Sequence, residues 1–279
     1  MSGKLNPTAQ PFAAVVLAAD RTGKDPITQH TGSACKAFAP VAGVPMIIRV
    51  LDTLQACDLI STIVLCGPPE SLHDQCPELK QRITSGQVTW LPNLDSPSRS
   101  ADSGLDHIPL DTPVLLTTAD HALLTPAIVR DFLQRAAATP CDAAVGAVSE
   151  QAINAAFPGC KRTIIRLRDG GFRGCNLYAF NPRGRALVGF WRQAEDLRKR
   201  PWRLIGKVLG FKAVFLYLFG LLTSQQGLAA VSEKSGVNIQ VIMLDDARAG
   251  VDVDKVEDLM LAESMLSQQS SSADSAQSS

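Results

Sequence analysis

A polar loop that ends in a lysine is the first place in this sequence with the residue types for chemistry. The loop covers residues 20–35, contains Gly23 and Gly32, and is followed at once by Lys36. Backbone amides of a glycine-containing loop can surround phosphate oxygens. An ammonium group at the end of such a loop can neutralise charge that grows on a phosphoryl group during transfer. The pattern therefore indicates phosphate chemistry, with an ordinary solvated lysine as the alternative.

Carboxylates beside apolar runs are the second candidate. Asp120 ends the run TPVLLTTAD, and Asp252 and Asp254 lie in GVDVDKVEDL, just before the last helical pattern. A carboxylate at a strand end is costly when buried without a partner and useful when it faces a divalent metal ion. As an alternative, Asp120 can serve only to begin the next helix. Spacing leaves open which of Asp252 and Asp254 would bind metal and which would cap the last helix. His121 is a weaker candidate for a general base, because a phosphate nucleophile is already ionised.

The hydrophobic pattern predicts an α/β fold that brings these residues together. Short apolar runs alternate with segments of helical periodicity. The expected strands are residues 11–19, 61–67, 88–92, 112–120, 142–149 and 237–244, and the expected helices are 44–57, 98–107, 126–138 and 256–266. Because parallel strands need long crossovers, this alternation favours a mostly parallel central sheet flanked by helices. Ligands of such sheets gather at the carboxyl ends of the strands, which is where the candidate residues stand.

The second half of the sequence departs from strict alternation. Residues 163–180 contain the turn signal Asp169-Gly170-Gly171 and predict a small antiparallel excursion. Helices are expected from 183 to 235, and no linker separates them from the rest. The predicted organisation is a flexible N-terminus, a single domain with this helical subregion, and a disordered tail, at residues 1–11, 12–266 and 267–279.

Composition limits the classes of partner and compartment. Lys+Arg and Asp+Glu number 27 each, so no overall charge favours nucleic acid as a partner. The seven cysteines lack the spacing of a zinc site and are expected as thiols in the cytoplasm. The longest apolar stretch, residues 213–222, is about half the length that a membrane-spanning helix needs.

Residues 183–222 combine basic and aromatic side chains, and three interpretations remain open for them. The first is a pair of helices packed on the sheet. The second is the surface of a homodimer or of an acceptor site. The third is weak contact with a membrane surface, through apolar rings and flanking positive charge.

Six segments together carry a resemblance to a known family: LAADRTGKDP, CKAF, PVAGVPMI, SADSGL, TTADHALLTP and VDVDKVEDL. In this order they resemble the NTP transferase superfamily, and in particular its MobA-like group, which is related to molybdenum-cofactor guanylyltransferases and sugar-phosphate nucleotidyltransferases. The resemblance extends from Ala14 to Leu261. It implies a Rossmann-like GT-A nucleotidyltransferase fold.

The resemblance also implies roles for individual residues. Lys36, Lys24 and Asp120 match the catalytic positions, and Asn176 matches a strand that touches the acceptor. Mg²⁺ would be held by Asp120 and Asp252, with Asp254 as the alternative to Asp252. The nucleotide would be bound by Leu17, Ala18, Ala19, Asp20, Gly23, Lys36, Ser100 and Gly104.

The implied reaction moves a nucleoside monophosphate from an NTP to a phosphorylated small molecule, with release of pyrophosphate. Asp20 and Thr22 replace the glycines of the family's first loop, and Ala122 replaces the proline of a D-x-P motif. Two alternatives follow. One is a GT-A glycosyltransferase that uses a nucleotide sugar, although Asp120-His121-Ala122 does not supply its usual D-x-D motif. The other is a non-catalytic, nucleotide-binding regulatory protein, suggested by the altered loop.

Overall fold

One central sheet organises the computed structural model, which describes residues 10–18, 25–160, 163–197 and 210–277. Its strands, in chain order, are β1 Phe12–Leu17, β4 Ile60–Gly67, β5 Thr89–Pro92, β6 Val114–Thr118, β7 Ala143–Ser149, β8 Ile165–Leu167, β9 Gly170–Phe180 and β10 Ile239–Met243. The spatial order is β10-β7-β9-β6-β1-β4-β5, with β8 paired to β9. A separate hairpin is formed by β2 Pro40–Val41 and β3 Val44–Pro45.

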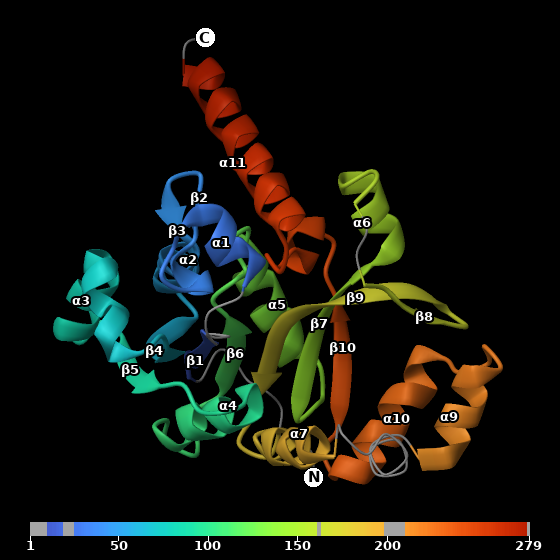
Figure 1. The fold of residues 1–279 in the computed structure, drawn as a ribbon. Coiled ribbons are helices and arrows are strands. Elements are labelled where there is room, and N and C mark those ends of the chain that lie inside the picture. Colours follow the sequence, from blue (N-terminus) through green and yellow to red (C-terminus); the bar gives the residue numbers. More distant parts are fainter. Residues whose placement is uncertain (1–9, 19–24, 161–162, 198–209, 278–279) are drawn as a thin grey trace.

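The sheet is mostly parallel, as the sequence predicted. Strand β1 lies between β4 and β6 and is parallel to both, and β7 is parallel to β10. The antiparallel excursion also forms, but its long strand β9 is inserted into the middle of the sheet, where it is antiparallel to β6 on one side and to β7 on the other. Strand β9 therefore joins two parallel groups of strands into one sheet (Figure 1).

Helices cover both faces of the sheet. Their bounds are α1 Pro26–Thr31, α2 Met46–Gln55, α3 Pro77–Thr84, α4 Pro97–Asp106, α5 Pro126–Ala138, α6 Glu150–Ala156, α7 Ala186–Asp196, α9 Gly210–Leu218, α10 Ser224–Ser235 and α11 Val256–Gln277, with short 3-10 turns at Lys36–Phe38, Glu70–Gln75 and Ala247–Gly250. Helices α2 and α5 share one core with the start of α11. Helices α4, α7 and α10 pack on the other face.

The two cores explain why the first strand is apolar at every position. Ala14 and Val16 belong to the core with α2 and α5, whereas Ala13, Val15 and Leu17 belong to the core with α4 and α7. Side chains of a strand alternate between the faces of a sheet, so a strand covered on both faces carries apolar residues throughout. The sheet is thereby fixed as a rigid platform for the residues at its carboxyl edge.

Several short helices were missed from sequence. Helix α1 lies in the loop that we expected over residues 20–35, where the Asp25 side chain accepts a hydrogen bond of 2.8 Å from the Ile27 backbone and Gly32 ends the helix at φ 70°. Only Ile27 of this helix is buried, so the sequence has no repeating apolar pattern from which the helix could be predicted. Helices α3 and α6 were missed for a similar reason, since each buries a single side chain.

The last helix differs from the prediction in length. Helix α11 begins at Val256, as expected, but continues to Gln277 and so through most of the predicted disordered tail (Figure 1). Once a helix has formed, each further residue adds one hydrogen bond, so a polar extension rich in alanine, glutamine and serine can propagate it. Among the described helices, none is long and apolar enough to cross a membrane.

Candidate active site

A cavity of about 480 Å³ lies at the carboxyl edge of β1 and β6, where the sequence predicted the site. This volume is typical of small-molecule sites. Strand β9, helix α7 and the N-terminal ends of α1 and α4 also contribute to the walls of the cavity. The lining residues are Leu17, Ala18, Asp25, Lys36, Ala37, Pro97, Leu116, Thr117, Thr118, Ala119, Asp120, Asn176, Tyr178, Trp191 and Asp254.

Lys36 lies between two carboxylates in this cavity. Its Nζ donates hydrogen bonds to Asp120 Oδ2 at 2.6 Å and to Asp254 Oδ1 at 2.8 Å. Burial acts to lower the pKa of Lys36, but the charge of Asp120 and hydrogen bonds to both carboxylates outweigh it, and the pKa is raised above its usual value. Lys36 is therefore a fixed positive charge at neutral pH, as phosphate binding requires.

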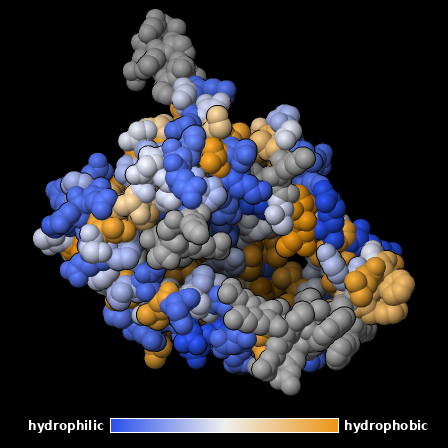
Figure 2. Space-filling view, in the orientation of Figure 1, coloured by the Kyte–Doolittle hydropathy of each residue, from blue (hydrophilic) through white to orange (hydrophobic). Residues whose placement is uncertain are grey.

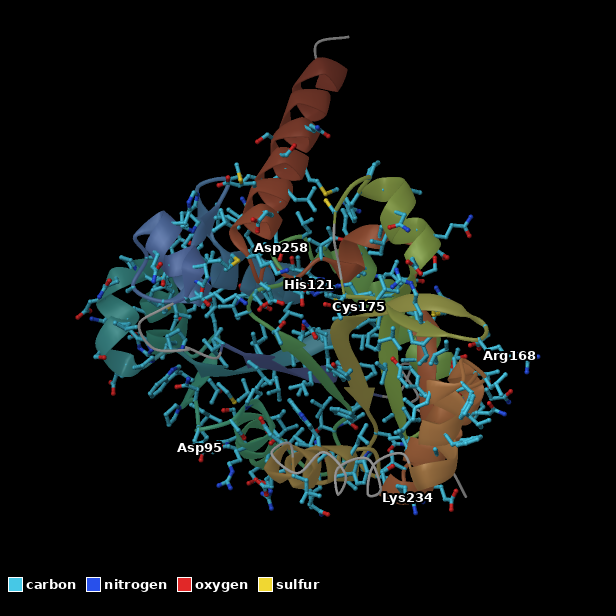
Figure 3. The ribbon with its side chains drawn as sticks, turned by 45° about the vertical axis from the view of Figure 1, so that its right-hand side comes forward. Asp95, His121, Arg168, Cys175, Lys234 and Asp258 are labelled. Atoms are coloured by element: carbon cyan, nitrogen blue, oxygen red, sulfur yellow. The ribbon has the colours of Figure 1, made fainter. Side chains whose placement is uncertain are left out.

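Asp120 is held by its own strand and by the VDVD segment. Thr118 Oγ1 donates to Asp120 Oδ1 at 2.6 Å, and the backbone nitrogen of Val253 donates to the Asp120 carbonyl at 3.0 Å. The second bond joins two acidic motifs that are far apart in sequence. Figure 3 shows the region, with His121 and Cys175 near the centre of the molecule and Asp258 close by at the start of α11.

Asp252 has different partners from Asp254. Its carboxylate is paired with Arg173, and Asn176 Nδ2 donates to its Oδ2 at 3.1 Å. Arg173 also donates from Nε to the carbonyl of Gly250 at 2.8 Å. Asp252 thus ties the VDVD segment to β9, whereas Asp254 shares Lys36 with Asp120. Arg173 was not identified from sequence, because only the insertion of β9 into the sheet brings it here.

A bulge in β9 aims Asn176 at the cavity. The pairing of β7 with β9 shifts register between Val145 and Ala147, and Asn176 adopts φ 49° within the shifted stretch. Asparagine is one of the few residues that tolerate this left-handed conformation, and bulges commonly redirect side chains beside functional sites. The pairing of β6 with β9 ends at Leu116 and Tyr178, so the two strands separate where the cavity begins.

Ser100 and Gly104 lie in α4 and do not line the cavity. The Ser100 hydroxyl accepts a hydrogen bond of 2.8 Å from the backbone of Leu94. A Cβ atom on Gly104 would lie 2.7 Å from Val15 Cγ1. Both residues therefore have structural reasons for their identity: the serine fixes the entry to α4, and the glycine lets α4 approach the sheet.

The remaining predicted residues divide into two groups. Leu17 and Ala18 line the same cavity as Lys36, and their role in binding a nucleotide stays a prediction. Four others lie outside the described residues, so the structure adds nothing on them: Ala19, Asp20, Gly23 and Lys24.

His121 is buried and does not line the cavity. Burial lowers its pKa, and the nearby charges of Asp120 and Asp252 only partly oppose this effect. The imidazole is therefore neutral at pH 7. The backbone of the turn Ala247–Gly250 opposes the lowering as well, and the position of the buried ring against this turn indicates a packing role for His121.

The described residues contain no group of three or more His, Cys, Asp or Glu side chains that could hold a metal ion by themselves. Asp120 and Asp254 nevertheless present carboxylate oxygens to one shared cation, the Lys36 ammonium. Mg²⁺ is commonly bound by one or two carboxylates, with water and substrate phosphates completing its shell. The two carboxylates therefore fit Mg²⁺ in the presence of a phosphorylated ligand.

Solved structures with the same architecture are transferases and synthases. A hypothetical transferase from Thermus thermophilus is 29% identical, with a TM-score of 0.73 over 90% of this chain and 99% of that one. A CMP:2-keto-3-deoxy-manno-octonic acid synthetase complexed with CTP is 15% identical, with a TM-score of 0.57 over 92% of this chain and 99% of the other. A 4-diphosphocytidyl-2C-methyl-D-erythritol synthase from Anaerococcus prevotii is 12% identical, with a TM-score of 0.55 over 92% and 96%.

The last two likenesses show the fold, which is the Rossmann-like nucleotidyltransferase fold expected from sequence. No curated protein matches the chain. Residues 14–236 match the MobA-like NTP transferase domain, and this match covers most of the chain. The protein therefore belongs to the MobA-like NTP transferase family, and its class is that of the nucleotidyltransferases.

Proposed function

We propose that the protein is a Mg²⁺-dependent nucleotidyltransferase that moves a nucleoside monophosphate from an NTP to a phosphorylated small molecule and releases pyrophosphate. The observation that carries this proposal is the triad of Lys36, Asp120 and Asp254 in a cavity at the carboxyl edge of the sheet. A permanent cation beside two carboxylates suits a reaction in which phosphate charge must be gathered and neutralised.

In the proposed reaction, an oxygen of the acceptor phosphate attacks the α-phosphorus of the NTP. The new P–O bond forms as the bond between the α-phosphorus and its bridging oxygen breaks, and pyrophosphate leaves with that electron pair. Lys36 binds phosphate oxygens and stabilises the added charge, since its pKa keeps it protonated. Mg²⁺ held by Asp120 and Asp254 would supply further charge neutralisation and align the NTP.

Lining residues on β9 and α7 are suited to position the acceptor. Asn176 extends from the bulge of β9 and is oriented by its hydrogen bond to Asp252. Its amide keeps a carbonyl oxygen and a second N–H for polar groups of the acceptor. Holding the acceptor in line with the scissile bond is the main contribution that a protein makes to this type of reaction.

The two alternatives are weaker. A glycosyltransferase of this fold would want a second carboxylate two residues after Asp120, where Ala122 is buried in the core. A non-catalytic regulator would not need two carboxylates on a half-buried lysine, an arrangement that costs desolvation free energy for Lys36 and Asp120. The cytoplasmic location, a homodimer and weak contact with a membrane at residues 183–222 stay predictions.

The test is pyrophosphate release from each of the four NTPs with Mg²⁺, against a panel of phosphorylated acceptors. We expect release that needs one NTP and one acceptor, and a loss of about a hundred-fold or more in Asp120→Ala. Asp245→Ala is a matched control, because the Asp245 side chain is fully exposed outside the cavity. Equal activity in wild type and Asp120→Ala would refute the assignment of the site.

A further inference from the structure

A second cavity adjoins the active site. It has a volume of about 190 Å³ and is lined by Leu116, Tyr178, Phe180, Leu187, Val188 and Trp191. Three of these residues, Leu116, Tyr178 and Trp191, also line the active-site cavity. The two spaces therefore adjoin each other at shared walls, and we call the second one the apolar annex. Figure 2 shows apolar side chains at the bottom of a hollow in this face of the molecule.

The walls of the apolar annex carry no charged side chain. Their polar side-chain atoms are the Tyr178 hydroxyl and the Trp191 indole nitrogen, and burial raises the pKa of Tyr178, so its hydroxyl stays neutral. A sugar hydroxyl placed here would lose water without gaining enough hydrogen bonds. A cavity of about 150 Å³ with apolar walls binds benzene, so the annex has the size and polarity for a ring or a chain of about six carbons.

The annex is preformed because α7 is anchored independently of any ligand. Arg185, directly before α7, donates from Nη1 to the Ile108 carbonyl at 3.0 Å and from Nη2 to the carbonyls of Pro109 and Thr112 at 2.6 and 2.7 Å. Val188 of α7 is buried in the core with α4. The annex wall is thus part of the fold, and filling it costs little ordering free energy.

The annex is built from different elements than the part of the cavity in which we expect the nucleotide. Leu17 and Ala18, at the end of β1, and Pro97 of α4 line the active-site cavity but not the annex. The annex is built from β6, β9 and α7. Lys36 and Asp120 line the active-site cavity, to which Leu116, Tyr178 and Trp191 of the annex also contribute. The annex contains no residue of β1 or α4 and shares strand β9 with Asn176, the residue proposed to contact the acceptor, so its position favours the acceptor as its occupant.

We propose that the acceptor is an amphiphile, with a phosphate that reaches Lys36 and an apolar ring or chain that fills the annex. This inference rests on the proposed function, because it names the class of the second substrate. It excludes acceptors that are polar throughout, such as simple sugar phosphates, as the preferred substrates.

The test is a series of alkyl phosphates, from methyl through propyl to hexyl, together with phenyl phosphate. Binding is measured by calorimetry with Mg²⁺ and an α,β-methylene NTP present, so that the nucleotide side is occupied. We expect the dissociation constant to fall about four-fold for each added methylene. Turnover is measured in parallel as pyrophosphate release from the natural NTPs with the same acceptors.

Leu187→Asp places a charge in the annex wall, and Leu110→Asp is the matched control, because Leu110 is 81% exposed and lines neither cavity. We expect the chain-length dependence to disappear in Leu187→Asp only. Leu187→Met, which keeps the volume and polarity, should retain it, and circular dichroism verifies that each variant is folded.

The outcomes separate the two proposals. Equal affinity across the series in wild type, or an unchanged series in Leu187→Asp, would overturn the amphiphilic acceptor. If Leu187→Asp binds NTP more weakly but keeps the chain-length dependence of alkyl phosphate binding, the annex would belong to the nucleobase. That result would also overturn the proposal of an amphiphilic acceptor. Failure of the proposed function appears differently, as absent pyrophosphate release with every NTP.

Discussion

Replacing Lys36 with methionine should lower activity and yet strengthen metal binding. Asp120 and Asp254 both accept hydrogen bonds from Lys36 Nζ, at 2.6 and 2.8 Å. Their bonded oxygens are therefore at most about 5.4 Å apart, where two negative charges repel by about 3 kcal/mol at an effective dielectric constant of about 20. Methionine has a similar length but no charge, so Lys36→Met leaves this repulsion without compensation.

In Lys36→Met, a divalent cation can relieve the repulsion between the two carboxylates, and no ammonium group competes with it. We expect Lys36→Met to bind Mg²⁺ without nucleotide about a hundred-fold more tightly than wild type, as about 3 kcal/mol implies. The catalytic step should slow by about a hundred-fold to a thousand-fold, because a donor to the transferring phosphoryl group is lost. Calorimetry with Mg²⁺ and pyrophosphate release with a saturating acceptor measure the two effects.

Lys255→Met is the matched control, since Lys255 is exposed and does not line the cavity. It should change neither quantity by more than about two-fold, as is usual for an exposed charge. Unchanged or weaker Mg²⁺ binding in Lys36→Met would refute the reasoning, because the two carboxylates would then not form the metal site.

Three further predictions test particular parts of the structure. Asp254→Asn should raise the Mg²⁺ concentration needed for half-maximal activity by about ten-fold. Asp252→Asn, which removes a partner of β9, should mainly raise KM for the acceptor. Equal effects of the two variants in Mg²⁺ titrations would contradict this division. Gly104→Ala should destabilise the fold by about 1–3 kcal/mol in urea unfolding because of its contact with β1, while Gly189→Ala, which meets nothing within 4 Å, should stabilise α7 by about 0.5–1 kcal/mol. Because the pKa of His121 is lowered in the fold, the unfolded chain binds a proton below pH 6.5 that the folded chain does not. The free energy of unfolding should therefore fall with acidification by up to about 1.4 kcal/mol per pH unit. His121→Gln should reduce this slope, and an unchanged slope would show that His121 does not cause it.

The sequence predicts the parts of this molecule that depend on continuous local patterns. Strand β1 is apolar at every position and β6 begins with three apolar residues, so the order of such strands with the helices indicates the α/β class. Lys36 and Asp120 can be selected because charged residues beside buried strands must have partners. Local patterns do not reveal which partner each one has, and for that reason the sequence left Asp252 and Asp254 as alternatives.

Other features depend on contacts between distant segments and have no local signal. Ser100 and Gly104 have the residue types of a nucleotide motif, and no local pattern shows that Ser100 also binds the Leu94 backbone or that Gly104 packs closely on β1. Arg173 resembles any basic residue of a hairpin until β9 is inserted beside β7. These cases share one physical cause: the relevant neighbour is contributed by a strand or helix far away in the sequence.

The insertion of β9 explains why the site has two compartments. In a sheet of parallel strands alone, the carboxyl ends lie at one edge, and a ligand there meets loops. Strand β9 runs the opposite way, so its bulge reaches this edge with Asn176 while Tyr178 and Phe180, farther along, form the floor of the apolar annex under α7. The same strand therefore offers a polar amide beside the phosphates and an apolar surface beyond them. A bulge that was straightened, for example by deleting one residue on each side of Asn176, should close the cavity and abolish acceptor binding while the fold persists, and retained binding would show that β9 does not shape the site.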